Sequence, residues 1–252
     1  MPLKVLVVGA SRGVGLQVTR ALVEGGDKFE VFALVRSQEK ASKALGSYAS
    51  RVKFIHGDIT KKESLILACQ GMDAVVCGVG AQSGWRLPGW NQYTPKYVDY
   101  IGVQYLVQAA VHNRVQKFVY VSSLGVTRPW LPIVFCLNAL YGRVLHWKSL
   151  AEKSLRDAYR QHDDLAYYIV RPGGLNDKEG DHHGIIFDQG DTSLGSITRR
   201  DVATVCVACV SEESPPNVTF EIINDMQNPA GDLKGISTLV PDSFHFSPSR
   251  GR

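Results

Sequence analysis

The sequence predicts an α/β fold in which one doubly wound, Rossmann-like parallel sheet of about six or seven strands carries helices on both faces. Short apolar runs rich in β-branched residues alternate along the chain with segments of helical spacing, the order that builds a parallel sheet with right-handed crossovers. A cluster of glycines follows the first apolar run at once. The length of 252 residues suits one large domain, which we expect over residues 1–224, with an extended, irregular C-terminal tail over 225–252.

The first predicted strand, Leu3 to Val8, runs into the glycine-rich segment GASRGVG, which opens a helix. Glycine allows positive backbone angles, and its missing side chain lets a pyrophosphate approach the backbone. The free amides and the dipole of the following helix attract negative charge. We therefore predict a nucleotide site here rather than a plain structural turn, with contacts from Gly9, Ser11, Arg12, Gly13, Val14 and Gly15.

The second strand is predicted over Phe29 to Val35, after a helix over Val14 to Glu24. Arg36 then stands where a protein that prefers NAD carries an acidic residue for the adenosine ribose. Arg12 can approach the same place from the glycine turn. Charge-assisted hydrogen bonds contribute about 1.5–3 kcal/mol each, so these two cations favour NADP(H) as the cofactor. The alternative is that both arginines are solvated surface charges.

Two positions after the next strands complete the predicted nucleotide site. Asp58 follows the strand Val52 to His56 and is placed to accept from the adenine amino group. Gly80 follows the strand Asp73 to Cys77, where a small residue lets the backbone pass close to the cofactor. The irregular segment 82–95 leaves the same edge of the sheet, so it forms part of a substrate-side wall or a packed surface loop.

The later elements continue the alternation of strand and helix. We expect a long helix over Lys96 to His112, strands over Lys117 to Ser122, Ala166 to Val170 and Val218 to Asn224, and a helix over Ile197 to Val210. The strand that ends at Val170 runs into a turn with Pro172 and Gly173, which remove bulk where a flat ring must approach. From Asp225 the sequence loses periodicity, so the tail either wraps the domain or binds something else.

Composition excludes several classes of function. The formal net charge is +4 without a long basic run, so we expect no nucleic-acid partner. No apolar run approaches the roughly 20 residues that span a bilayer, and we expect a soluble protein. The five cysteines sit mostly in apolar sequence, which indicates buried free thiols in a reducing compartment, the cytoplasm or an organelle. Cys206 and Cys209 form a CxxC in an apolar helix, where core packing is favoured over a metal or redox pair.

Two further segments have competing interpretations. The apolar stretch Leu131 to Leu145 is a helix packed on the core, a lid over the nicotinamide, or a patch that docks on a membrane or a partner subunit. Burial is the commonest fate of such a segment, so the first interpretation is favoured. Asp181, His182, His183 and Asp188 have the side chains of a metal cluster, but a glycine-rich loop fixes no geometry. We predict a solvated loop and no metal.

Several segments resemble the short-chain dehydrogenase/reductase superfamily in its atypical, compact NAD(P)H-binding branch. They are GASRGVG at 9–15, ALVR at 33–36, GDIT at 57–60, KFVYVSSLGV at 117–126, YYIVRPGGL at 167–175 and ITRRDVA at 197–203. LNALYGRVLHWKSLAEKSL is most similar to the NADP-binding domain of the chloroplast inner-envelope translocon accessory subunit and its plant and cyanobacterial relatives. The resemblance implies NADP(H) as cofactor, nicotinamide contacts from Pro172 and Gly173, and the chloroplast stroma as the location.

Reductases of this superfamily use a serine and a Tyr-x3-Lys motif, and that motif is absent here. Lys148 lies where the lysine is expected to bind the nicotinamide ribose, but the residue four positions before it is Val144, which transfers no proton. The remaining catalytic candidates are Ser123, after the fifth strand, and Tyr141, seven residues before Lys148.

Two functions fit these residues. The first is an NADPH-dependent oxidoreductase acting on a small apolar carbonyl, enone or quinone, with a proton from water, Tyr141 or the substrate. The second is a non-catalytic NADP(H)-binding subunit, structural or redox-sensing, of a larger organellar or photosynthetic membrane complex. The intact cofactor frame favours the first, whereas the lost tyrosine and the apolar segment 131–145 favour the second. Fold does not fix function, so neither the substrate nor the oligomeric state follows from the sequence.

Overall fold

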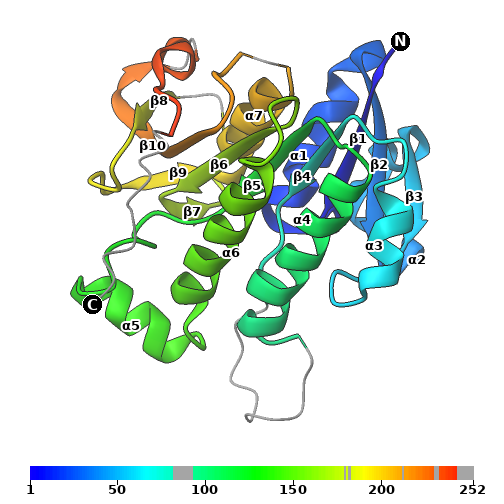
Figure 1. The fold of residues 1–252 in the computed structure, drawn as a ribbon. Helices are drawn as coiled ribbons and strands as arrows, with labels where there is room; N and C mark the ends of the chain where they lie inside the picture. The colour runs from blue at the N-terminus through cyan, green and yellow to red at the C-terminus, as the bar shows by residue number, and fades with distance from the viewer. Residues whose placement is uncertain (82–92, 179, 181–182, 212, 230–232, 243–252) are drawn as a thin grey trace, which may run out of the picture.

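The computed structural model describes residues 1–81, 93–178, 180, 183–211, 213–229 and 233–242. Its centre is an eight-stranded sheet with the strand order β3-β2-β1-β4-β5-β6-β10-β8 (Figure 1). Neighbouring strands are parallel except β8, which runs antiparallel to β10. The direction of winding reverses between β1 and β4. Open α/β sheets bind ligands at such a switch point, outside the carboxyl ends of the strands.

The main sheet contains β1 (Leu3–Val8), β2 (Phe29–Val35), β3 (Val52–His56), β4 (Ala74–Cys77), β5 (Lys117–Val121), β6 (Ala166–Pro172), β8 (His183–Asp188) and β10 (Val218–Pro229). A small second sheet pairs β7 (Gly174–Asn176) with β9 (Ser196–Thr198). The α-helices are α1 (Gly13–Glu24), α2 (Gln38–Leu45), α3 (Lys62–Ala68), α4 (Val103–His112), α5 (Pro132–Leu140), α6 (Val144–Tyr159) and α7 (Arg199–Val210). Shorter elements are the 3-10 turns Gly26–Lys28, Gly46–Arg51 and Lys234–Thr238, and the π-helix Lys96–Gly102.

Alternate residues of each central strand pack on opposite faces of the sheet and form two hydrophobic cores. In β1, Val5 and Val7 join the core that α1 and α7 cover, whereas Leu6 and Val8 join the core that α4 and α6 cover. Fully burying such a side chain stabilises the fold by about 1.5–3 kcal/mol relative to leaving it in water. Strands buried on both faces have continuous apolar sequences, which is why the sequence predicts β1, β4 and β5 closely.

Three features differ from the expectations. The segment 183–188 forms β8 rather than a solvated loop, and it adds an eighth, half-buried edge strand to the sheet. The helix expected over Lys96 to His112 begins as a π-helix and becomes an α-helix only at Val103. Cys136 is exposed, whereas Cys206 and Cys209 are fully buried in α7 as core residues, which confirms the interpretation of the CxxC.

The chain after β10 packs on the domain as far as it is described. β10 itself continues to Pro229, past the end expected at Asn224. Ile236 and Leu239 are buried in the core that α1 and α7 cover. The tail was expected either to wrap the domain or to bind something else, and residues 233–242 wrap the domain.

Candidate nucleotide site

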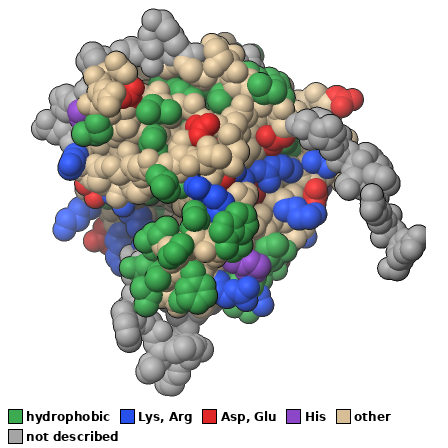
Figure 2. All heavy atoms as spheres, turned by 90° about the vertical axis from the view of Figure 1, so that its left-hand side faces the viewer, with side chains coloured by type: hydrophobic (Ala, Val, Ile, Leu, Met, Phe, Trp, Pro, Cys, Tyr) green, Lys and Arg blue, Asp and Glu red, His purple; other side chains and the backbone are tan. Residues whose placement is uncertain are grey.

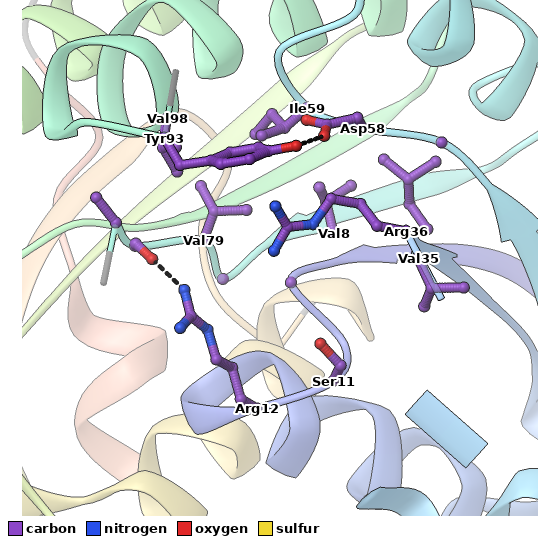
Figure 3. A pocket seen from close by; sticks show the side chains of 16 residues that line it. Val8, Ser11, Arg12, Val35, Arg36, Asp58, Ile59, Val79, Tyr93 and Val98 are labelled. Atoms are coloured by element: carbon purple, nitrogen blue, oxygen red, sulfur yellow. Dashed lines mark hydrogen bonds between the residues drawn. The ribbon is translucent and has the colours of Figure 1, made fainter. Parts of the chain in front are cut away.

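A cavity of about 750 Å³ opens at the carboxyl ends of β1, β2, β3 and β4 (Figure 3). Its volume lies within the roughly 300–1,000 Å³ that small-molecule and cofactor sites occupy. Among the residues predicted from the sequence, those that line it are Gly9, Ser11, Arg12, Arg36, Asp58 and Gly80. Gly13, Val14 and Gly15 form the first turn of α1 directly after the lining residue Arg12. The sheet topology thus brings the predicted phosphate, ribose and adenine positions to one cavity.

The glycine turn fits tightly between β1, α1 and the end of β4. Gly9 has a φ of +96°, and a Cβ at this position would lie 2.9 Å from the Gly78 carbonyl oxygen. A Cβ on Gly15 would lie 2.4 Å from the Gly9 carbonyl oxygen. Only glycine allows this backbone angle and these approaches. Arg12, the N-cap of α1, makes no capping hydrogen bond through its side chain, which leaves the first-turn amides available to an anion.

Two arginines border the cavity from neighbouring strand ends. Arg12 donates from Nη2 to the Gly80 carbonyl oxygen at 2.8 Å, which ties the glycine turn to the segment after β4. Burial lowers the pKa of Arg12, the charge of Arg36 lowers it further, and Asp99 partly opposes both. Among the lining residues in the described part of the chain, Asp58 is the only carboxylate. An anion between the two guanidinium groups would relieve their repulsion.

Tyr93 takes the carboxylate oxygen that we predicted for the adenine amino group. Its hydroxyl donates to Asp58 Oδ2 at 2.7 Å, and its ring centroid lies 4.3 Å from the Arg36 guanidinium carbon (Figure 3). Asp58 Oδ1 already accepts from the Thr60 amide and hydroxyl, each at 2.9 Å. Burial raises the pKa of Asp58, but the bonds from Thr60 and Tyr93 and the charge of Arg36 bring it below its ordinary value. Tyr93 therefore lies beside the position predicted for the adenosine, and residues 82–92 of the expected wall lie outside the described residues.

Lys148 is buried beneath the ends of β4 and β5. Its Nζ lies 3.3 Å from Asp99 Oδ1 and donates to the carbonyl oxygens of Val121 at 3.2 Å and Val79 at 3.5 Å. Asp99 is fully buried in the π-helix, and its Oδ2 accepts from the Ala81 amide at 3.0 Å. Val79 and Ala81 line the cavity, whereas Lys148 does not. The ion pair thus supports the wall of the cavity from behind.

The serines after β5 are engaged in other bonds. The Ser122 hydroxyl donates to Glu152 Oε1 at 2.6 Å, and the Ser123 hydroxyl donates to the carbonyl of the next residue at 3.2 Å. Glu152 also accepts from Arg171 Nε at 2.9 Å and Nη2 at 2.7 Å. Burial alone would lower the pKa of Arg171, but its bonds to Glu152 and Glu221 raise it above its ordinary value. Ser122 is therefore part of a charged, buried network that links α6 to β6 and β10.

The remaining predicted residues lie apart from the cavity. Tyr141 is the C-cap of α5 and is partly exposed, whereas Lys148 lies on α6. Arg143 between them has a φ of 62°, so the two side chains do not share one helix. Pro172 and Gly173 are buried at the end of β6, and a Cβ on Gly173 would lie 2.5 Å from the Gly195 carbonyl oxygen. Packing against the backbone accounts for this glycine, and its contact with nicotinamide stays a prediction.

In the described ranges no three His, Cys, Asp or Glu residues lie close enough together to hold a metal ion. His183 and Asp188 are the ends of β8, and Asp181 and His182 lie outside the described residues. None of the helices in the described part of the chain combines the length and apolarity needed to cross a membrane.

A family model described as NAD(P)H-binding matches residues 9–213 of the sequence. The chain is 30% identical to an uncharacterized chloroplastic protein of Arabidopsis thaliana, over 96% of this chain and 77% of the relative. It is 32% identical to the chloroplastic protein TIC 62 of Oryza sativa subsp. japonica, over 82% of this chain but only 43% of that relative. It is also 30% identical to sanguinarine reductase of Eschscholzia californica, over 87% of this chain and 88% of the reductase.

Two solved structures illustrate the likeness of the fold. The oxidoreductase YlbE of Lactococcus lactis has a TM-score of 0.71 at 23% identity, over 88% of this chain and 91% of that chain. ChuY of Escherichia coli O157:H7, described as an anaerobillin reductase, has a TM-score of 0.67 at 24% identity, over 90% of this chain and 100% of that chain. At these identities the likeness shows the fold alone.

Proposed function

The chain belongs to the NAD(P)H-binding family and is an atypical short-chain dehydrogenase/reductase related to TIC 62, and on this basis we propose that it is an NADPH-dependent oxidoreductase. The substrate we propose is a small apolar carbonyl, enone or quinone. The name of the relative sanguinarine reductase supports the reaction class. The missing Tyr-x3-Lys motif argues for acceptors whose reduction needs no tyrosine as acid.

The observation that carries the choice of NADPH is the pair of guanidinium groups at one cavity. Arg12 and Arg36 both line it, and Arg36 stands at the end of β2, where a carboxylate would repel a 2′-phosphate. In the bound state the cofactor supplies the hydride. Arg12 and Arg36 then hold phosphate, the glycine turn accommodates the pyrophosphate, and Asp58 faces the adenine.

The residues of this chain orient the reactants rather than supply a proton. Lys148 is held behind the cavity wall by Asp99 and by two backbone carbonyls, and we propose that it positions the wall segment around Val79 against the nicotinamide ribose. The Ser122 hydroxyl donates to Glu152 and the Ser123 hydroxyl to the Leu124 carbonyl oxygen, and Tyr141 lies at the end of another helix. The proton therefore comes from solvent or from the substrate itself.

The test begins with calorimetric titrations of NADPH, NADP⁺ and NADH, followed by NADPH oxidation with a panel of apolar carbonyls, enones and quinones. We expect NADPH to bind at least about tenfold more tightly than NADH, as one charge-assisted bond predicts, and at least one acceptor to oxidise it. Lys148→Met should lower kcat/KM, whereas Lys153→Met, at an exposed position of the same helix, should not. Tight binding of NADPH without its oxidation by any acceptor would contradict the proposed oxidoreductase activity.

A non-catalytic NADP(H)-binding subunit is the second candidate, and the exposure of segment 131–145 favours it. Only Val134 is buried in α5, and exposed apolar surfaces of this kind mark contacts with a partner or a membrane. Because several relatives are chloroplastic, we propose the chloroplast stroma as the location in either case. A redox-sensing role requires different affinities for NADPH and NADP⁺, so equal affinities in the titrations would exclude it.

A further inference from the structure

Large, exposed apolar side chains gather on α5 and at its two ends. We call them the α5 patch, which consists of Trp130, Ile133, Phe135, Leu140 and Tyr141, with exposed fractions of 72%, 60%, 68%, 68% and 42%. Figure 2 shows hydrophobic side chains standing out on the face of the molecule that carries α5. The helix is held by Val134, which packs in a small cluster with Val126 and Leu145. No element in the described part of the chain covers its outer side, which can therefore meet another apolar phase.

The chemistry of the patch matches lipid better than protein. The helix reads PIVFCLNAL and carries no charged side chain. Protein interfaces usually contain a hydrogen bond per roughly 100–200 Å², and the side chains of the α5 patch offer only the polar tips of Trp130 and Tyr141. These two residues flank the helix on either side, as aromatic side chains flank apolar segments at membrane interfaces.

The stretch of sequence that contains the α5 patch carries basic but no acidic side chains. Residues 100–151 contain no Asp or Glu. Lys96 and Arg143 are exposed, and both lie over the Trp147 ring, with Nζ at 5.8 Å and Cζ at 5.9 Å from its centroid. In Figure 2, basic side chains border the hydrophobic group. A second copy of the same patch would bring like charges together, whereas an anionic surface would attract them.

We propose that α5 is an interfacial helix that docks this protein on an anionic bilayer. At about 14 Å in length, the helix is suited to lie in the plane of the interface, with the α5 patch in the boundary between headgroups and acyl chains. Lys96 and Arg143 then meet the lipid phosphates. Because the chain reaches α5 from the carboxyl end of β5, docking brings the sheet edge that holds the cofactor cavity toward the membrane. The proposal uses no residue of the nucleotide site and stands independently of the reductase activity.

Flotation with phosphatidylcholine vesicles, with and without phosphatidylglycerol, tests the proposal. We expect the full chain to bind the anionic vesicles and to bind the zwitterionic ones more weakly. The double variant Ile133→Ser/Phe135→Ser should lower binding by about tenfold for each side chain removed. Leu67→Ser is the matched control, because Leu67 is 71% exposed on α3 and lies outside the patch. An unchanged affinity for NADPH in every variant shows that the fold is retained.

The charge contribution is tested separately with Arg143→Gln, which should weaken binding to anionic vesicles about fivefold and leave binding to phosphatidylcholine unchanged. Added salt should have the same effect as the substitution. The proposal is overturned if the wild-type chain binds neither kind of vesicle, or if Leu67→Ser lowers vesicle binding as much as the double variant does. It is also overturned if sedimentation shows a dimer that Ile133→Ser/Phe135→Ser dissociates, because the patch would then belong to a second copy.

Discussion

The guanidinium of Arg36 stands at the end of β2, within 4.3 Å of the Tyr93 ring. Arg36→Asp places a carboxylate where we expect the 2′-phosphate, so it should weaken NADPH binding by about 1.5–3 kcal/mol, or roughly 10- to 100-fold. NADH lacks that phosphate, and its affinity should stay nearly constant. Calorimetric titration measures both, with the exposed Arg51→Asp as a charge-matched control. An equal loss for the two cofactors would show that Arg36 does not discriminate between them.

Tyr93 occupies the carboxylate oxygen of Asp58 that we propose for the adenine amino group. The Tyr93 hydroxyl bonds Oδ2, while Oδ1 is taken by Thr60. Tyr93→Phe frees Oδ2 and should therefore tighten the binding of NADPH and NADH alike, by about 1 kcal/mol or roughly fivefold. The same titrations report it, and the ratio of the two affinities should not change. Weaker binding would mean that the hydroxyl helps to hold the cofactor.

The hydrogen bond from Tyr93 to Asp58 should also affect how folding stability depends on pH. The pKa of Asp58 in the folded chain lies below its ordinary value, with the Tyr93 bond among the causes. Such a group stabilises the fold above the pKa of the unfolded chain, and this contribution is lost as pH falls through the folded pKa. Tyr93→Phe should thus be less stable than the wild type near neutral pH, and the difference should shrink in acid. Urea unfolding at several pH values measures it, with Tyr97→Phe as control; a difference independent of pH would refute the linkage.

At the scale of elements, the close packing of β1, α1 and β4 depends on glycine at particular positions. A Cβ on Gly15 would lie 2.4 Å from a backbone oxygen, whereas a Cβ on Gly80 has its nearest neighbour, Asp99 Oδ1, at 3.9 Å. We expect Gly15→Ala to cost about 1–3 kcal/mol of unfolding free energy, because backbone atoms must shift. Gly80→Ala should stay within about 0.5 kcal/mol of the wild type. Urea unfolding compares the two, and similar stabilities would mean that the turn relaxes freely.

The two ends of the α5–α6 region show how one sequence pattern can serve different purposes. The apolar run 131–145 looks continuous, but the left-handed Arg143 divides it into α5 and the start of α6. Leu145 is buried, whereas Ile133 and Phe135 are exposed. The favoured interpretation of the run was a helix packed on the core. The α5 part does not follow it, because no described element covers the outer side of this helix.

At the scale of the whole molecule, Asp242 ties the C-terminal segment to α6, β6 and β10. Its carboxylate accepts from Arg156 Nε at 3.1 Å, from the Tyr167 hydroxyl at 2.8 Å and from the Thr219 amide at 3.0 Å. Asp242→Ala removes the acceptor of the Tyr167 hydroxyl and the Thr219 amide and one acceptor of Arg156, so it should cost about 2–4 kcal/mol, since bonds to charged groups contribute about 1.5–3 kcal/mol each. Thermal unfolding measures the loss. Asp163→Ala, at an exposed site, is the control, and equal melting temperatures would show that the segment is not held by Asp242.

The sequence predicted the parallel sheet, its principal strands and the glycine turn because these features are local. Val5 to Val8 form a continuous apolar run since β1 is buried on both faces, and Gly15 is required by its close approach to the Gly9 carbonyl oxygen, six positions earlier. For the same reason Arg12, Arg36 and Asp58 could be placed at one edge: each lies within a few residues after the end of a strand, and parallel strands bring their carboxyl ends to one edge. The NAD(P)H-binding family followed from these local features.

Only the tertiary structure decided which side chains meet across that edge. Tyr93 reaches Asp58 over 35 positions of sequence, and Lys148 meets Asp99 through the packing of α6 on the π-helix. No periodicity encodes such contacts, because they depend on where elements distant in the chain are placed. The exposure of α5 and the edge strand β8 could not be predicted from the sequence for the same reason. Apolar or mixed segments have the same local pattern whether or not another element covers them.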